Sequence, residues 1–161
     1  MSVAVPPDPD QPPDTAAPDT AALRGAAPGG AGIGVLGPVH HVGVACRDLE
    51  AARRWVHATH TVVEDSGVVY DPHQKADLCL LTVDGGANIE LVAGEAVASL
   101  VKKGHTYYHL CYEVPSVADA IAGLQAHQCL VVSAPAPAVL FGGRTVAFLY
   151  GPTGLVELLE T

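Results

Sequence analysis

The same order of predicted elements occurs twice along this chain, over residues 39–94 and again over residues 106–160. Each copy predicts a strand, a helix and three further strands. A histidine stands in the first strand of each copy, and these two, His41 and His109, lie 68 positions apart. A glutamate stands in the last strand of each copy, and these two, Glu90 and Glu157, lie 67 positions apart. Two residue pairs with nearly the same separation along the sequence indicate an internal repeat. This repeat constrains the fold more than any other feature.

The first copy contains a capped helix between strands. Asp48 is a good N-cap, and Leu49, Ala52 and Trp55 after it predict an apolar helical stripe. A turn at Asp84-Gly85-Gly86 predicts the hairpin between the last two strands. The predicted strands span residues 39–46, 61–70 (two short pieces around a turn), 75–83 and 88–94, and the helix spans 49–58.

The second copy repeats this order after a short helical linker at 95–104. Ser116 is the N-cap, and Val117, Ile121 and Leu124 predict one apolar helix face. We expect Tyr107 to be a core residue. The predicted strands span residues 106–114, 129–135, 144–150 and 155–160, the helix spans 117–127, and the Pro-rich stretch 134–143 is expected to be a loop.

Residues 1–36 differ in composition from the rest of the chain. This stretch is rich in Pro, Ala, Asp and Gly and has no aromatic residue. It holds too little apolar surface to offset chain entropy, so we expect a disordered or loosely ordered extension. The domain is then expected at 37–161, with module one at 37–95 and module two at 105–161.

The net charge and the cysteines restrict which classes of function and which cellular setting we expect. The net charge is −9, which argues against a nucleic-acid partner that would need a basic face. No run of 18 apolar residues predicts a membrane span, and no secretory signal is recognisable at the N-terminus. The four cysteines, at 46, 79, 111 and 129, form no C-x-x-C pair. We therefore expect reduced, mostly buried thiols and a cytoplasmic setting.

The four repeat-related residues predict a metal site. Glu90 and Glu157 each lie between apolar neighbours, and a buried carboxylate is costly unless it is paired or bound to a metal. Two such glutamates with two matching histidines, His41 and His109, predict four converging ligands for one divalent ion. Zn, Ni, Co, Mn and Fe(II) all suit this donor set. Taken singly, each histidine also suits a surface or core position and each glutamate an edge strand, and His40 is a rival for His41.

The segments that carry these residues resemble a known superfamily. They read HHVGVACRDLEAA, NIELV, YYHLCYEVPSVADAI and VAFLYGPTGLVELLE. In this order they resemble the vicinal oxygen chelate (glyoxalase/bleomycin resistance) superfamily over residues 38–161, and within it methylmalonyl-CoA epimerase and glyoxalase I relatives. The resemblance implies an α+β fold in which paired βαβββ modules form a cup-shaped mixed sheet around a metal. It implies the same four ligands, with His41 rather than His40 because His41 directly precedes Val-Gly.

Two positions depart from the epimerase pattern. Epimerases of this type commonly carry Gln where this chain has Glu90, whereas bacterial glyoxalase I carries Glu. Epimerases also use a second acid/base Glu near the segment YDPHQKAD of this chain, where alignment places His73.

The resemblance implies a metal-dependent epimerase or isomerase that removes a proton next to a carbonyl. Glu157 is the expected base and His73 the expected second acid/base group. The substrate would be an acyl thioester, including a CoA or carrier-protein thioester, or a 2-oxo compound. Arg144 and Lys103 are candidate substrate contacts, and a homodimer is compatible with the family. The alternatives are a glyoxalase I-like lyase acting on a hemithioacetal and a non-catalytic small-molecule-binding or drug-resistance protein.

Overall fold

The computed structural model describes residues 34–161, so the expected extension lies outside the described residues except for its last three positions. The first repeat contains β1 (Val39–Ala45), α1 (Leu49–Thr59), β2 (Val62–Asp65), β3 (Val69–Asp71), β4 (Ala76–Val83) and β5 (Asn88–Gly94). A 3-10 turn, η1 (Glu95–Val97), and α2 (Ala98–Lys102) link it to the second. The second repeat contains β6 (Tyr107–Val114), α3 (Val117–Gln125), β7 (Leu130–Pro137), β8 (Thr145–Gly151) and β9 (Gly154–Glu160).

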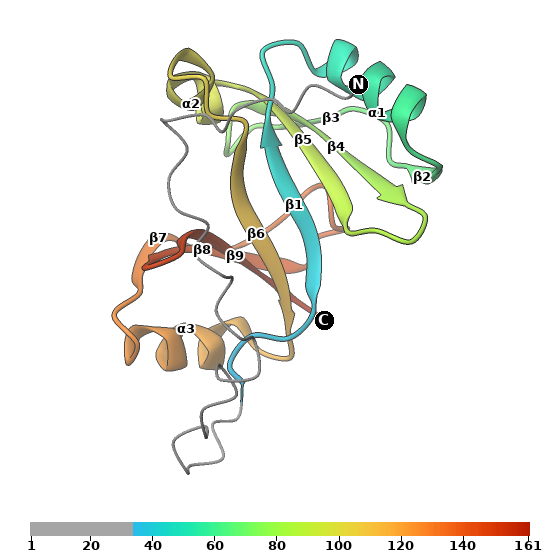
Figure 1. The fold of residues 1–161 in the computed structure, drawn as a ribbon. Coiled ribbons are helices and arrows are strands. Elements are labelled where there is room, and N and C mark those ends of the chain that lie inside the picture. The colour runs from blue at the N-terminus through green and yellow to red at the C-terminus, as the bar shows by residue number, and fades with distance from the viewer. Residues whose placement is uncertain (1–33) are drawn as a thin grey trace, which may run out of the picture. The chain divides into compact units, whose positions relative to one another are not determined.

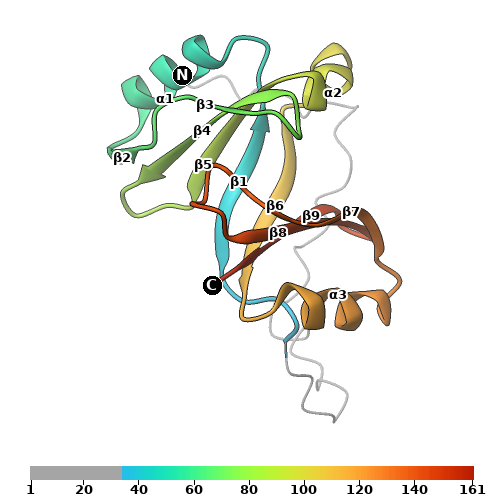
Figure 2. The same cartoon turned by 180° about the vertical axis from the view of Figure 1, so that it is seen from behind.

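All strands form one curled mixed sheet in the order β2-β4-β5-β1-β6-β9-β8-β7, with β3 paired to β4. Within each repeat the first and last strands pair in parallel, β1 with β5 and β6 with β9. The two repeats join through the antiparallel pair of β1 and β6. Figures 1 and 2 show β7, β8 and β9 running at a steep angle to β1 and β6, so the sheet curls between β6 and β9. The α+β fold with two modules in one sheet matches the sequence expectation.

The register confirms that the two repeats are equivalent. In β1 and β5, His41 pairs with Asn88, which lies two positions before Glu90. In β6 and β9, His109 pairs with Leu155, which lies two positions before Glu157. The same offset in both parallel pairs explains why the two spacings in the sequence agree.

The helices α1 and α3 each cover strands of their own repeat, and both predicted caps are present. Asp48 accepts a hydrogen bond from the Ala51 N–H (2.9 Å), and Ser116 accepts one from the Asp119 N–H (3.2 Å). The predicted stripe of α1 is wrong at Trp55, which is 59% exposed. Val56 is buried instead, because it lies seven residues, or nearly two helical turns, after Leu49.

Module two packs its helix through residues close to those predicted. Val117, Ala120 and Leu124 of α3 are buried against β8 and β9. Val35 and Leu36, at the start of the described residues, pack partly buried against the same cluster. The expectation for Tyr107 is wrong, because this side chain at the start of β6 is 74% exposed.

The stretch expected to be a loop is partly a strand. β7 extends to Pro137, and Ala138 and Phe141 in the turn after it are buried. β7 pairs only with β8 at the edge of the sheet, and an edge strand tolerates proline because half of its N–H groups need no ladder partner. All four cysteines are free and three are buried, as expected. None of the helices in residues 34–161 is both long and apolar enough to cross a membrane.

Candidate metal centre

Four neighbouring strands in the middle of the sheet each contribute one residue to a single cluster. In sheet order, β5 carries Glu90, β1 carries His41, β6 carries His109 and β9 carries Glu157. We call these residues the four-residue cluster. Their exposed fractions are 4%, 0%, 4% and 2%. The structure therefore brings together the four residues that the sequence singled out, and it buries all of them.

A glycine makes room for one of the histidine rings. Gly43 pairs with His109 across β1 and β6. A Cβ atom at Gly43 would overlap the His109 ring, so the ring lies directly over the Gly43 backbone. Glycine is the residue that permits this close approach.

The polar atoms of the cluster meet within a small volume. Glu157 Oε2 lies 2.9 Å from His41 Nε2 and 3.1 Å from His109 Nε2. The two Nε2 atoms lie 3.1 Å apart. Glu90 Oε2 lies 3.4 Å from each Nε2. Candidate ligand atoms of all four side chains lie within 4.8 Å of one another.

The histidines and glutamates of the cluster have complementary charges. Burial raises the pKa of Glu157, but the nearby His109 and His41 nitrogens outweigh burial and lower it to about 2. Burial lowers the pKa of His41, but Cys111 and the two glutamates raise it to about 12. The two buried carboxylates therefore stabilise a positive charge at their common centre, on an imidazole or on a bound divalent ion.

The donor set fits a divalent metal. Glu157 Oε2 is buried and has no hydrogen-bond partner of suitable geometry, although two ring nitrogens are near it. A buried acceptor without a donor is costly, and an ion at the common centre removes that cost. Atoms that each lie about 2.1 Å from one ion would be about 3.0–3.4 Å apart for right-angle to tetrahedral arrangements. The observed separations of 2.9–3.4 Å are of this size.

His40 supports the cluster from outside it. Its Nδ1 lies 2.8 Å from His41 Nδ1, on the side of the His41 ring away from the centre. The Phe141 ring stacks on His41 with a centroid distance of 5.4 Å and meets His40 edge-on at 5.5 Å. Between the two candidates in the sequence, His41 is therefore the one that joins the four-residue cluster, and His40 orients it.

A hollow of about 250 Å³ lies beside the cluster, separated from it by side chains that contact the His109 ring. We call it the inner hollow. Tyr108 and Phe148 line it and also contact the His109 ring edge-on, at centroid distances of 4.5 and 5.5 Å. Burial raises the pKa of Tyr108, so its phenol stays neutral. The residues that line the inner hollow are Gln74, Ala96, Val97, Tyr108, Val132, Ser133, Phe148 and Leu155.

The remaining predicted site residues lie outside the inner hollow. His73 is exposed in the turn between β3 and β4, where its backbone N–H donates a hydrogen bond to Asp71 Oδ1 (2.8 Å). Its neighbour Gln74 lines the hollow instead, and only its place beside His73 could have indicated this from the sequence. Arg144 Nη1 lies 3.7 Å from Glu113 Oε1. Lys103 is exposed at the end of α2.

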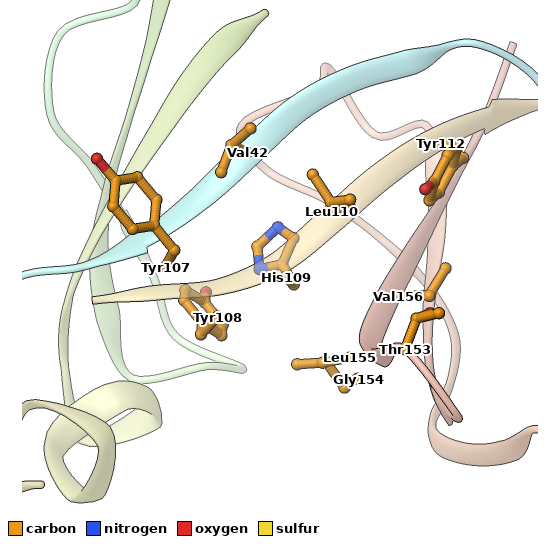
Figure 3. A pocket seen from close by; sticks show the side chains of 10 residues that line it. All are labelled: Val42, Tyr107, Tyr108, His109, Leu110, Tyr112, Thr153, Gly154, Leu155 and Val156. Carbon is orange, nitrogen blue, oxygen red and sulfur yellow. The ribbon is translucent and has the colours of Figure 1, made fainter. Parts of the chain in front are cut away.

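A larger hollow of about 500 Å³, the outer groove, runs along β1, β6 and the turn before β9 (Figure 3). Its lining includes His109 of the cluster, and it shares Tyr108 and Leu155 with the inner hollow. Val42, Leu110 and Tyr112 continue it, with Thr153 and Gly154 at one end. Val42 and Leu110 occupy strand positions that alternate with the two histidines, so they point to the other face of the sheet. Among the residues that line the outer groove, His109 is the one that belongs to the cluster, whereas Tyr108 and Phe148 of the inner hollow both pack against the His109 ring. We therefore take the inner hollow as the candidate substrate site.

Paired modules that meet in one curled sheet, with a His/Glu cluster at their junction, define the class of this fold. A profile of the Glyoxalase/Bleomycin resistance protein/Dioxygenase superfamily matches residues 40–148. The chain belongs to this superfamily, as the sequence motifs implied.

Solved structures share the fold at low sequence identity. Methylmalonyl-CoA epimerase from Mycobacterium tuberculosis matches with a TM-score of 0.64 and 24% identity, covering 78% of this chain and 89% of that one. A hypothetical protein from Bacillus halodurans matches at 0.63 and 22%, covering 77% and 94%. A methylmalonyl-CoA epimerase variant from Streptomyces coelicolor, in complex with 2-nitronate-propionyl-CoA, matches at 0.62 and 24%, covering 78% and 95%. No curated protein matches the chain. These likenesses establish the fold.

Proposed function

We propose that the four-residue cluster binds one divalent metal and that the protein is an epimerase or isomerase acting next to a carbonyl. The observation that carries this proposal is the convergence of two imidazoles and two carboxylates, all buried, beside a hollow that can hold an acyl group. The substrate we propose is an acyl thioester or a 2-oxo compound. The thioester is supported by the CoA ligand of an epimerase with the same fold.

A bound divalent ion would act as a Lewis acid that draws electron density toward the substrate carbonyl oxygen. The protein's part is to hold the acyl group in place. Phe148 and Leu155 present apolar surface to it, and the neutral phenol of Tyr108 can donate a hydrogen bond. Closing this small space to water strengthens each electrostatic contact inside it.

Glu157 is the proposed base. The α-carbon–hydrogen bond breaks, the proton passes to a Glu157 carboxylate oxygen, and the electron pair moves toward the carbonyl oxygen. Burial raises the pKa of this carboxyl and the two histidines lower it. If the Glu157 carboxylate turns away from the histidines toward the substrate, burial still raises its pKa and the histidines no longer lower it. The carboxylate then becomes a stronger base. A proton returned from the opposite side gives the epimer, and His73 is the proposed donor if its turn swings inward.

The test compares two substitutions at equivalent positions of the repeat. Glu157→Gln should lower solvent-deuterium exchange at the substrate α-carbon by about 10²–10⁴-fold, because the base is lost. Glu90→Gln changes the cluster by the same charge but keeps the base, so it should lower the exchange less than Glu157→Gln does. NMR of the substrate in D₂O measures the exchange. Exchange at the native rate in Glu157→Gln would overturn the assignment of the base.

A second candidate, a glyoxalase I-like lyase, is favoured by one observation, the glutamate at position 90 where epimerases of this type commonly carry Gln. A panel of CoA thioesters and glutathione hemithioacetals, assayed with Co, Ni, Zn and Mn, separates the two. A protein that binds these compounds without exchange or turnover would be a binding module instead. The four free cysteines support a reducing, cytoplasmic setting for either activity.

A further inference from the structure

The metal-loaded cluster would carry no net charge. A metal-bound imidazole is neutral, so the two histidines contribute none, and the two glutamates contribute two negative charges that a divalent ion balances. A glutamine at position 90 would leave one positive charge at the same place. The residue at this position therefore decides whether the centre attracts a second negative group on the substrate or is indifferent to it.

The walls of the inner hollow offer no positive charge in compensation. Among the described residues that line it, none is Lys, Arg or His, and the polar ones are Gln74, Tyr108 and Ser133. On either side of Gln74 along the chain, His73 is exposed in the turn, and Lys75 Nζ lies 3.1 Å from Glu95 Oε2. Arg144 lies on the His40 side of the cluster, 3.7 Å from Glu113.

The apolar part of the lining suits a hydrocarbon group. Val97, Val132, Phe148 and Leu155 face the hollow together with Ala96. An additional carboxylate placed among these side chains would lose its hydration without gaining a cation or a set of N–H donors. Leaving a charge buried and unpaired is one of the main ways in which a site rejects a competing ligand.

We propose that the acyl group accepted beside the centre is an uncharged aliphatic group, so that the substrate is not a malonyl-type acid with a second carboxylate. This inference rests on the proposed function, since it names the substrate class of the same site. It separates this chain from the epimerases that share its fold, whose printed names specify methylmalonyl-CoA.

The test uses two thioesters that differ in one group. Isobutyryl-CoA and methylmalonyl-CoA share the CoA portion and the α-hydrogen, and a methyl in the first replaces a carboxylate in the second. Binding of each to the full-length zinc-loaded protein is measured by titration calorimetry. We expect isobutyryl-CoA to bind about 100-fold more tightly, the size of effect that an unpaired buried charge produces.

Two variants test the cause. Glu90→Gln should shift the affinity ratio at least tenfold toward methylmalonyl-CoA. Ser133→Lys adds a cation to the wall and leaves the four-residue cluster intact, so it should shift the ratio the same way even if Glu90→Gln binds metal poorly. Asp77→Asn, which removes an exposed charge on β4, is the control and should leave the ratio unchanged.

Each outcome decides the inference. Equal or tighter binding of methylmalonyl-CoA by the native protein would overturn it, and so would a failure of isobutyryl-CoA to bind. An unchanged ratio in Ser133→Lys would overturn the electrostatic explanation. If isobutyryl-CoA binds selectively but its α-hydrogen does not exchange with D₂O, the charge preference stands and the proposed proton abstraction fails.

Discussion

Single residues hold the cluster in place, and Gly43 does so by having no side chain. We expect Gly43→Ala to displace the His109 ring, at a cost of about 1–3 kcal/mol in the free energy of unfolding. Metal affinity should fall about 10–100-fold, the usual effect of misplacing a ligand. Gly86→Ala is the matched control, since its added Cβ meets nothing closer than a Val83 methyl at 3.8 Å. Zinc titration and urea unfolding measure both effects. Native zinc affinity in Gly43→Ala would contradict the account.

The adjacent histidines His40 and His41 should differ in a titration with Co²⁺. His41→Gln removes a cluster nitrogen and should abolish stoichiometric binding. His40→Phe removes only the contact to His41 Nδ1, so the affinity should fall about 10–100-fold. His40→Asn keeps a polar group near that nitrogen and should recover part of the loss. If His40→Phe abolished binding and His41→Gln did not, the ligand assignment would be reversed.

At the scale of elements, Asp65 at the end of β2 connects α1 to the sheet. Its Oδ2 accepts hydrogen bonds from Arg53 Nε (2.8 Å) and His57 Nε2 (2.7 Å), and its Oδ1 accepts one from the Gly67 N–H (2.8 Å). Burial raises the pKa of Asp65, but Arg53, His57 and the Gly67 N–H together hold it well below its usual range. The carboxylate therefore stabilises the fold above the unfolded-state pKa of about 3.9, and this contribution is lost as pH falls toward the lower folded-state value.

We expect Asp65→Asn to destabilise the protein by about 1–2 kcal/mol at pH 7 and by progressively less below about pH 4. Urea unfolding at a series of pH values measures the difference. Asp77→Asn is again the control, with a small effect at every pH. A penalty for Asp65→Asn that did not change with pH would show that the ionised carboxylate is not the stabilising group.

The sequence could predict most elements, because the repeat, the two N-caps and the strand alternation are local signals. It could also predict the four-residue cluster, because the equal spacing of the His and Glu pairs is set by the shared register of β1–β5 and β6–β9. It could not predict the lining of the inner hollow. Gln74 comes from a turn and Ser133 from an edge strand, and their approach depends on how the sheet curls. The sequence could not predict the exposure of Trp55, because Trp55 and Val56 lie three and four positions after Ala52 and both spacings suit one helix face.

At the scale of the whole molecule, one chain supplies the complete cluster. Metal binding should therefore reach one equivalent per chain at any protein concentration. Because an ion held by this cluster would bind the folded state alone, zinc at 100 times its Kd should add about 2.7 kcal/mol of stability, or on the order of 10 °C in Tm. Thermal unfolding with zinc and with EDTA, over a wide range of protein concentration, measures this. A zinc-induced shift that vanished on dilution would indicate ligands from a second copy.

The central claim is that His41, Glu90, His109 and Glu157 together bind one divalent ion. The most direct measurement is an anomalous difference map from crystals grown with Co²⁺. We expect a single strong peak per chain, with both Nε2 atoms and an oxygen of each glutamate about 2.0–2.2 Å from it. No peak at this position, or a peak bound by other residues while these four remain unligated, would contradict the account.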